Sequence, residues 1–166
     1  MRIPLSKARI QSAAGVTMIE LVIVILIIGI LAVIAVPKWP TSVNLEFEAR
    51  RLLSDIRYTQ GLSMATGERY RWVKVAANSY QITNEAGTPI IMPSGATQIV
   101  LVDQAVFGTL SNLPNSLLAF DSRGVPYTDA SIPGTALAAT ATISITASGR
   151  TRTVSITPET GYGALT

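Results

Sequence analysis

The sequence lacks two of the side chains that most often take part in catalysis. The 166-residue chain contains no Cys and no His, which excludes disulfides, thiolate nucleophiles, His-ligated zinc and His general bases. Asp121 and Glu159 could form a carboxylate pair, but no spacing in the sequence brings them together. Asp121 precedes Ser122-Arg123-Gly124, a turn signature in which an Asp side chain commonly accepts hydrogen bonds from backbone amides. We therefore expect a protein that is not an enzyme and has no cofactor or metal site.

Two closely spaced arginines are the candidates for ligand binding. Residues 141–146 and 152–156 alternate in polarity and predict two strands, with residues 147–151 as the hairpin tip. Arg150 and Arg152 are two residues apart, so both side chains leave the same face of the strand. Guanidinium groups suit phosphate oxygens, which makes DNA a candidate partner. The alternative is that the arginines keep a hairpin soluble and block edge pairing.

The net charge argues against general attraction to nucleic acid. The formal charge is +3 and the pI is about 9.5, but Arg2, Lys7 and Arg9 lie in the first fifteen residues, which carry no acid. From Val16 onward there are ten Lys or Arg and ten Asp or Glu. A chain that begins at Val16 is therefore close to neutral, and any DNA contact would depend on a local patch.

An apolar segment at residues 16–36 predicts a membrane helix. Its 21 residues form a helix about 32 Å long, which matches a bilayer core of about 30 Å. The preceding basic residues predict a cytoplasmic N-terminus, with the remainder outside the inner membrane. A cleaved secretory signal fits less well, because its apolar core would be about 7–15 residues long and end at a small-x-small site. A plain signal anchor is another alternative.

Glu20 is the one acid in this segment. A carboxylate at depth in a membrane costs about 2–3 kcal/mol or more unless it is paired, and such residues are usually functional. Cleavage after Gly15 would create a partner, because it exposes a new amino group on Val16, four residues before Glu20. Alternatively, Glu20 lies near enough to the membrane interface to stay hydrated.

The segment from Gly15 to Pro37, Gly-Val-Thr-Met-Ile-Glu-Leu followed by an apolar run that ends at Pro, resembles the class III signal of type IV pilins and type II secretion pseudopilins. The resemblance implies cleavage between Gly15 and Val16 by a prepilin peptidase and N-methylation of Val16. It also implies that Glu20 pairs with the N-terminal amine of a neighbouring subunit. Val16 is a departure, because the family usually has Phe at this position.

Two residues predict a weak point in the helix. Pro37 removes a backbone hydrogen bond and clashes with the preceding turn, at a cost of about 3 kcal/mol in an ordinary helix. Gly29 is a weak helix former. These residues alone predict a modest kink at the membrane exit, and the resemblance implies that residues 29–37 can melt and extend during assembly.

A second helical pattern covers residues 45–66. Apolar residues recur at helical spacing, and Gly67 is a plausible C-terminal cap. The apolar stripe consists of Leu45, Ala49, Leu52, Leu53 and Ile56, and the charged residues expected on the other faces are Glu46, Glu48, Arg50, Arg51, Asp55 and Arg57.

Beyond Gly67 the pattern changes to a period of two. Strands are predicted at 69–76, 79–83, 98–103, 117–121, 139–147 and 151–157, and loops at 112–116 and 129–134. The expected fold is α+β, with a long N-terminal helix, one half transmembrane and one half amphipathic, packed on an antiparallel β-sheet. The predicted parts are a leader (1–15), a membrane and filament-core helix (16–36), an amphipathic half (37–67) and a sheet domain (68–166).

The body of the chain resembles the GspH/FimT family of minor pilins and pseudopilins. The motifs are Leu-Leu-Ser-Asp-Ile-Arg-Tyr-Thr-Gln at 52–60, Ala-Thr-Gly at 65–67, Phe-Asp-Ser-Arg-Gly at 120–124 and Thr-Pro-Glu-Thr-Gly-Tyr at 157–162. Gly149-Arg150-Thr151-Arg152 is similar to the Gly-Arg-x-Arg pattern linked to DNA binding in FimT-like competence pilins.

This resemblance implies a type IV pilin fold and a structural subunit, a minor pilin, of a filament assembled from the inner membrane. The implied partners are other pilins or pseudopilins, the prepilin peptidase and the inner-membrane assembly platform. Three alternatives stay open: a minor pseudopilin of a type II secretion system, a DNA-binding minor pilin for natural transformation, and a signal-anchored periplasmic enzyme.

Overall fold

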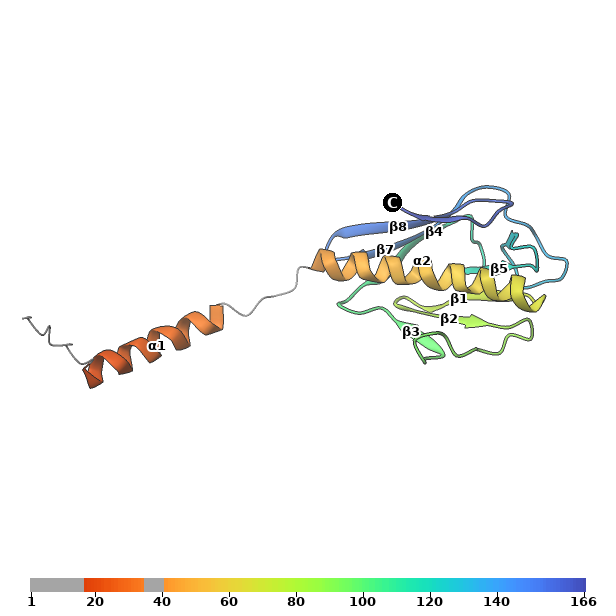
Figure 1. Cartoon of the computed structure of the whole chain (residues 1–166). Coiled ribbons are helices and arrows are strands. Elements are labelled where there is room, and N and C mark those ends of the chain that lie inside the picture. Colours follow the sequence, from red (N-terminus) through yellow and green to blue (C-terminus); the bar gives the residue numbers. More distant parts are fainter. Residues whose placement is uncertain (1–16, 35–40) are drawn as a thin grey trace, which may run out of the picture. The chain divides into compact units, whose positions relative to one another are not determined.

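The computed structural model describes residues 17–34 and 41–166, which form two units. The first contains helix α1 (Met18–Ile34) and the second contains everything from helix α2 onward (Figure 1). Thr17 caps α1, because its side-chain oxygen accepts a hydrogen bond from the Glu20 amide at 3.3 Å. Within the ranges that the structure describes, no helix combines the length and the apolar character that a membrane span requires.

Helix α2 (Thr41–Thr66) buries one face against the sheets. Leu45, Ala49, Leu52 and Ile56 are 0–3% exposed, as the helical spacing predicted. The helix ends at Gly67, which has a φ of 79° and donates its amide to the Ser63 carbonyl at 3.0 Å. The predicted C-terminal cap is thus confirmed, since a left-handed conformation costs glycine little.

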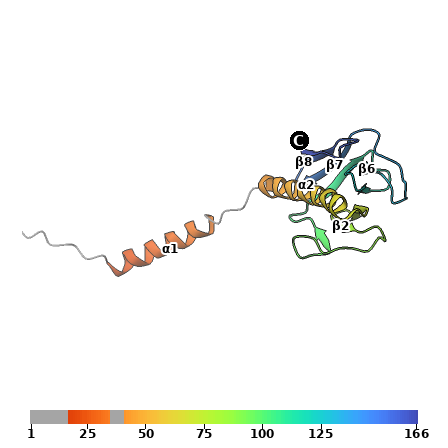
Figure 2. The same cartoon turned by 45° about the vertical axis from the view of Figure 1, so that its right-hand side comes forward.

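The nine strands among the described residues form two antiparallel sheets rather than the single sheet that the sequence predicted. The first sheet has the order β3-β2-β1-β5-β6, with β1 (Tyr70–Ala76), β2 (Ser79–Thr83), β3 (Gln98–Val100), β5 (Leu117–Phe120) and β6 (Pro126–Tyr127). The second has the order β4-β7-β8-β9, with β4 (Val106–Ser111), β7 (Ala141–Ala147), β8 (Arg150–Ile156) and β9 (Gly163–Leu165). Helix α2 lies along both sheets (Figures 1 and 2).

The differences from the predicted strands have local causes. Strand β3 ends at Val100. The Leu101 amide still bonds to the Asn78 carbonyl in the β2–β3 register, and the chain then turns at Asp103 and Gln104, whose φ values are 54° and 60°. Strands β4, β6 and β9 were missed. Two of these have only two or three residues, and β4 contains Gly108 and a bulge that breaks its alternation.

An aromatic cluster joins the two sheets beneath α2. Trp72 and Tyr80 come from the first sheet and Phe107 from the second, and their ring centroids are 5.6–6.0 Å apart. The Trp72 and Tyr80 side chains are fully buried. Buried apolar side chains extend from Leu45 to Ile156, so the second unit contains its own hydrophobic core.

Candidate functional site

The residues predicted for processing and assembly lie in or beside α1. Gly15, Val16 and Pro37 fall outside the described residues, so cleavage, methylation and the kink stay predictions. Glu20 lies in the first turn of α1 and is exposed. Gly29 lies inside α1, and the helix continues through it to Ile34.

Thr17 is a residue of this site that sequence reasoning missed. It stands three residues before Glu20, the Thr-x-x-Glu spacing of a capping box, and its side chain caps the helix. The N-terminal end of a helix also favours a negative charge through its dipole. Glu20 therefore occupies a position in the helix where an anion is favourable, in addition to the amine that sequence analysis expects nearby.

The β7–β8 hairpin carries the two candidate arginines. Ala147 pairs with Arg150, and the two tip residues, Ser148 and Gly149, have φ values of 49° and 74°, as a tight type I′-like turn requires. Arg150 and Arg152 share one face of β8 with the buried Val154, as predicted.

That face points toward α2, so Arg152 has a partner that the sequence did not indicate. Its Nε atom donates to Oε2 of Glu46 at 2.7 Å, and Glu46 also pairs with Arg50 through Oε1 at 2.7 Å. The hydrogen bond from Arg152 is the main cause that holds the pKa of Glu46 below its usual value. The guanidinium of Arg152 is thus engaged with Glu46, and contact of Arg150 and Arg152 with DNA stays a prediction.

Three sequence motifs that lie far apart in the chain meet at Gln60. Its Nε2 atom donates to the carbonyl oxygens of Gly124 at 2.9 Å and Thr160 at 2.8 Å. Gly161 has a φ of 64°, and a Cβ atom there would lie 2.6 Å from Gln60 Nε2 and 2.7 Å from the Gly124 oxygen. The turn at 120–124 and the turn at 157–162 are therefore fastened to the same point of α2.

Asp121 acts as a structural residue, as its turn signature predicted. Its Oδ1 atom accepts hydrogen bonds from the amides of Arg123 and Val125, both at 2.9 Å. Burial raises the pKa of Asp121, but these amide bonds and the Arg123 guanidinium outweigh it and lower the pKa overall. No hydrogen bond or ion pair within residues 17–34 and 41–166 joins Asp121 to Glu159, which is exposed.

The sequence pattern placed Glu48 on an exposed face of α2. In the structure its side chain is only 1% exposed. It falls three residues after Leu45 and four before Leu52, so its position belongs to the buried stripe. Neither carboxylate oxygen has a hydrogen-bond partner among the described residues, and Arg51 lies 3.7 Å away. Burial raises the pKa of Glu48, against the opposing effect of Arg51.

A second acid, Asp55, lies seven residues after Glu48, about two turns further along α2. Its Oδ2 atom accepts a hydrogen bond from the Tyr80 hydroxyl at 2.6 Å. Burial raises the pKa of Asp55, and burial and the Asp55 charge raise that of Tyr80. Helix α2 thus carries one buried acid, Glu48, and one half-buried acid, Asp55, which is bonded to Tyr80 of the first sheet.

No protein-family model matches the chain, and no curated protein matches its sequence. Two crystal structures of the type IV minor pilin FimU of Pseudomonas aeruginosa are similar to it, each at 15% identity over 74% of this chain. They give TM-scores of 0.52 and 0.51, with 87% and 92% of the FimU chain covered. The likeness shows a type IV pilin-like fold, α+β with antiparallel sheets, whereas membership of the GspH/FimT family stays a prediction.

Proposed function

We propose that this chain is a structural subunit, a minor pilin, of a type IV pilus-like filament. It is made with a leader (1–15), stored in the inner membrane through residues 16–36, and then assembled with other pilins. The prepilin peptidase cleaves after Gly15 and methylates Val16, and the inner-membrane assembly platform moves the subunit from lipid to filament. The domain from α2 onward stays outside the membrane and forms the filament surface.

The surface of α1 is the observation that carries this proposal. Every side chain from Thr17 to Leu31 is exposed. Residues 21–28 are Leu, Val and Ile without interruption, and eight consecutive residues cover more than two helical turns. Apolar side chains therefore surround the helix, which is typical of a helix buried in a membrane or in a helical bundle rather than one with a single buried stripe.

The helix must exchange one apolar environment for another during assembly. Lipid and neighbouring helices both remove these side chains from water, so the exchange keeps the hydrophobic stabilisation of about 25 cal/mol per Å² of buried surface. The Glu20 carboxylate can be buried in the filament core only when an opposite charge pairs with it. We infer that the amine of Val16 in an adjacent subunit supplies the pairing charge and thereby sets the register between helices.

The FimU likeness favours a pilus over a type II secretion system as the host of this subunit, because both similar structures are type IV minor pilins. A pseudopilin would use the same apolar helix and the same carboxylate. Since the likeness is one of fold, this preference is part of the proposal.

N-terminal sequencing and the intact mass of the native protein test the proposal. The expected mature chain begins at Val16 and carries one added methyl group. In cells that lack the prepilin peptidase, the expected product is the uncleaved precursor. A final cellular form that retains residues 1–15 would contradict the proposal and would favour a signal-anchored protein.

DNA contact is a second candidate function because of one feature, the exposed hairpin tip. Arg150 projects beside the tip residues and forms no ion pair within the described part of the chain. Arg152 and Arg50 share one carboxylate, that of Glu46. Together with Arg150, these side chains carry a net positive charge. Two or three phosphate contacts would give weak, salt-sensitive binding.

A further inference from the structure

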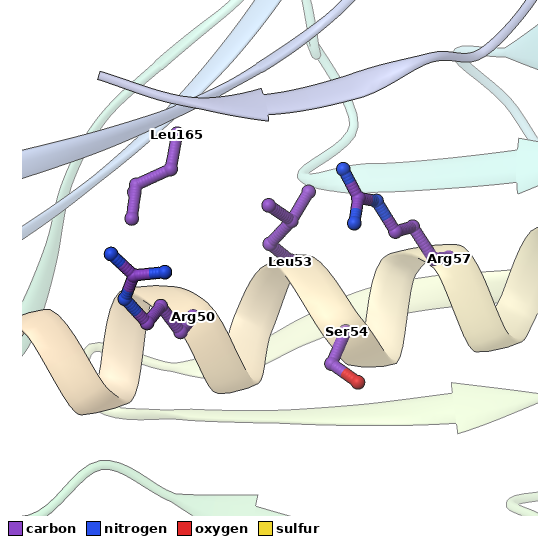
Figure 3. A pocket seen from close by; sticks show the side chains of 5 residues that line it. All are labelled: Arg50, Leu53, Ser54, Arg57 and Leu165. Carbon is purple, nitrogen blue, oxygen red and sulfur yellow. The ribbon is translucent and has the colours of Figure 1, made fainter.

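The flank of α2 carries a groove that the proposed filament role does not use. Arg50, Leu53, Ser54 and Arg57 line it from α2, and Leu165 lines it from β9 (Figure 3). Its volume is about 240 Å³. In Figure 3, Arg50, Leu53 and Arg57 extend from the helix toward the strand, with Leu53 between the two arginines, and the Leu165 side chain extends toward Arg50. The groove thus has an apolar centre between two guanidinium groups.

The guanidinium groups retain hydrogen-bonding capacity. One nitrogen of Arg50 pairs with Glu46, and one nitrogen of Arg57 donates to the Gly163 carbonyl at 2.9 Å. A guanidinium has five N–H donors, so each arginine can still bind a carboxylate. Glu46 is shared with Arg152, which leaves three guanidinium groups and one carboxylate around this flank. The excess positive charge favours an acidic partner.

The backbone of β9 directs hydrogen-bonding groups away from β8, beside this groove. Thr153 and Thr166 exchange both backbone hydrogen bonds, and the Thr157 amide donates to the Tyr162 carbonyl. Because bonding alternates along an antiparallel pair, Gly163 and Leu165 direct their N–H and C=O groups away from β8. The Gly163 carbonyl already accepts the bond from Arg57, which agrees with this direction, so the open groups are the Gly163 N–H and the N–H and C=O of Leu165. Strand β9 is also the last strand of its sheet, so this edge has no neighbouring strand among the described residues.

We propose that the outer edge of β9 and the Arg50–Arg57 groove bind an extended acidic segment of a neighbouring filament subunit, which adds to the sheet as a further strand. The backbone of the segment pairs with Gly163 and Leu165, as in other cases of strand addition. Its acidic side chains, two residues apart on one face of the added strand, bind the two arginines, and the side chain between them points away from the groove.

The dimensions agree with an extended peptide. Arg50 and Arg57 are seven residues apart, about 10.5 Å along the helix axis. Acidic residues that alternate along an extended chain recur about every 6.6 Å on one face, which two flexible arginine side chains can span. The identity of the partner as a filament subunit rests on the proposed function, whereas the binding chemistry of the groove does not.

A peptide titration tests this inference on the full chain in detergent micelles. The probe is a blocked peptide, Thr-Glu-Val-Glu-Val-Glu-Thr, and the matched control peptide has Gln in place of each Glu. Calorimetry measures affinity, and amide hydrogen exchange by NMR reports the backbone of β9. The expected result is binding of the acidic peptide alone, with new protection of the Gly163 and Leu165 amides.

Protein variants separate the two parts of the site. Arg50→Gln with Arg57→Gln is expected to weaken binding at least about tenfold, since each charge-assisted bond is worth that order. Arg150→Gln, which removes one guanidinium outside the groove, is the matched control and should bind as the unaltered chain does. Leu165→Pro removes the edge N–H and should abolish binding, whereas Leu165→Val should preserve it. Near-ultraviolet circular dichroism of each variant checks that the aromatic core is intact.

Several results would overturn the inference. These are failure of the unaltered chain to bind the acidic peptide at millimolar concentration, equal binding of the Gln peptide, and binding without protection of the Leu165 amide. Equal competition by acetate at the same carboxylate concentration would also overturn it, because it would indicate a simple anion site. None of these results bears on the start of the mature chain at Val16, so a failure here is distinguishable from a failure of the proposed function.

Discussion

The side-chain amide of Gln60 donates a hydrogen bond of 2.8 Å to the carbonyl oxygen of Thr160, one hundred residues later in the chain. The same nitrogen donates to the Gly124 carbonyl. One side chain of α2 therefore holds a turn from each sheet region, and the geometry leaves no room for a side chain at Gly161. The bonds connect three of the four body motifs by which the sequence resembles minor pilins, those at 52–60, 120–124 and 157–162.

Removal of this junction should destabilise the domain. Gln60→Ala leaves the Gly124 and Thr160 carbonyls without their donor, and the expected loss in unfolding free energy is about 1–3 kcal/mol. Gln60→Glu keeps the size of the side chain but replaces the donor by a carboxylate. It should cost at least as much at neutral pH. Urea denaturation of the full chain in micelles measures both, and a Glu variant as stable as the unaltered chain would refute the role of the donor.

Gly161→Ala tests the close approach itself. The left-handed conformation costs an added Cβ atom about 1–2 kcal/mol, and the contact with Gln60 and the Gly124 oxygen should add to that cost. Gly149→Ala is the matched control, since its φ is also positive, at 74°, but no atom lies within 4 Å of the added Cβ. We expect Gly161→Ala to be clearly the less stable variant in thermal unfolding. Equal losses would mean that the junction relaxes around the methyl group.

Glu48 should make stability depend on pH. Burial raises its pKa, so the folded chain binds this proton more tightly than the unfolded chain. The contribution of Glu48 to the free energy of unfolding is then fully present below the ordinary glutamate pKa of 4.5. It is lost as pH rises toward the raised pKa of the folded chain. Glu48→Gln should flatten this fall and be more stable than the unaltered chain at neutral pH.

Two other acids define the control for that experiment. Asp55 is shifted in the same direction by burial, so part of the fall should persist in the Glu48 variant. The pKa of Glu46 is lowered, so its contribution is lost as pH falls. Glu46→Gln should therefore leave the loss of stability at rising pH unchanged. Urea midpoints measured from acidic to neutral pH provide the test, and an unaltered slope in Glu48→Gln would refute the assignment.

Glu20→Gln should separate processing from assembly. Cleavage depends on the Gly15–Val16 bond, so the mature N-terminus should be unchanged. Loss of the paired charge should reduce the amount of this subunit in sheared filaments at least about tenfold, as expected for a lost buried ion pair of a few kcal/mol. Glu68→Gln, which changes an exposed acid of the domain, is the control. Normal incorporation of the Glu20 variant would contradict the register role.

The Arg152–Glu46 pair yields a sharp test of DNA binding. Arg150→Gln with Arg152→Gln should abolish any salt-sensitive shift of duplex DNA by the full chain. Glu46→Gln should strengthen the shift, because it removes the carboxylate that competes with phosphate for Arg152. The slope of log affinity against log salt concentration should change by about one for each phosphate that an arginine newly neutralises or ceases to neutralise. No shift by the unaltered chain at low salt would exclude this function.

Sequence patterns were sufficient where the determining interactions are local. The buried stripe of α2, its end at Gly67, the β1–β2 and β7–β8 hairpins and the Asp121 turn all follow from residues a few positions apart. Their spacing carries the signal, since helical and strand periodicities are properties of short segments. The apolar character of residues 21–36 and the isolation of Glu20 likewise need no tertiary information.

Only the tertiary structure decided which distant segments meet. The division into two sheets, the junction at Gln60, the pairing of Arg152 with Glu46 and the edge that β9 leaves open each depend on residues far apart in the chain. Burial of Glu48 was decided in the same way, because the width of the buried stripe depends on what packs against it. Such contacts form when the chain closes on one core, and a distant partner leaves no periodic mark on the sequence.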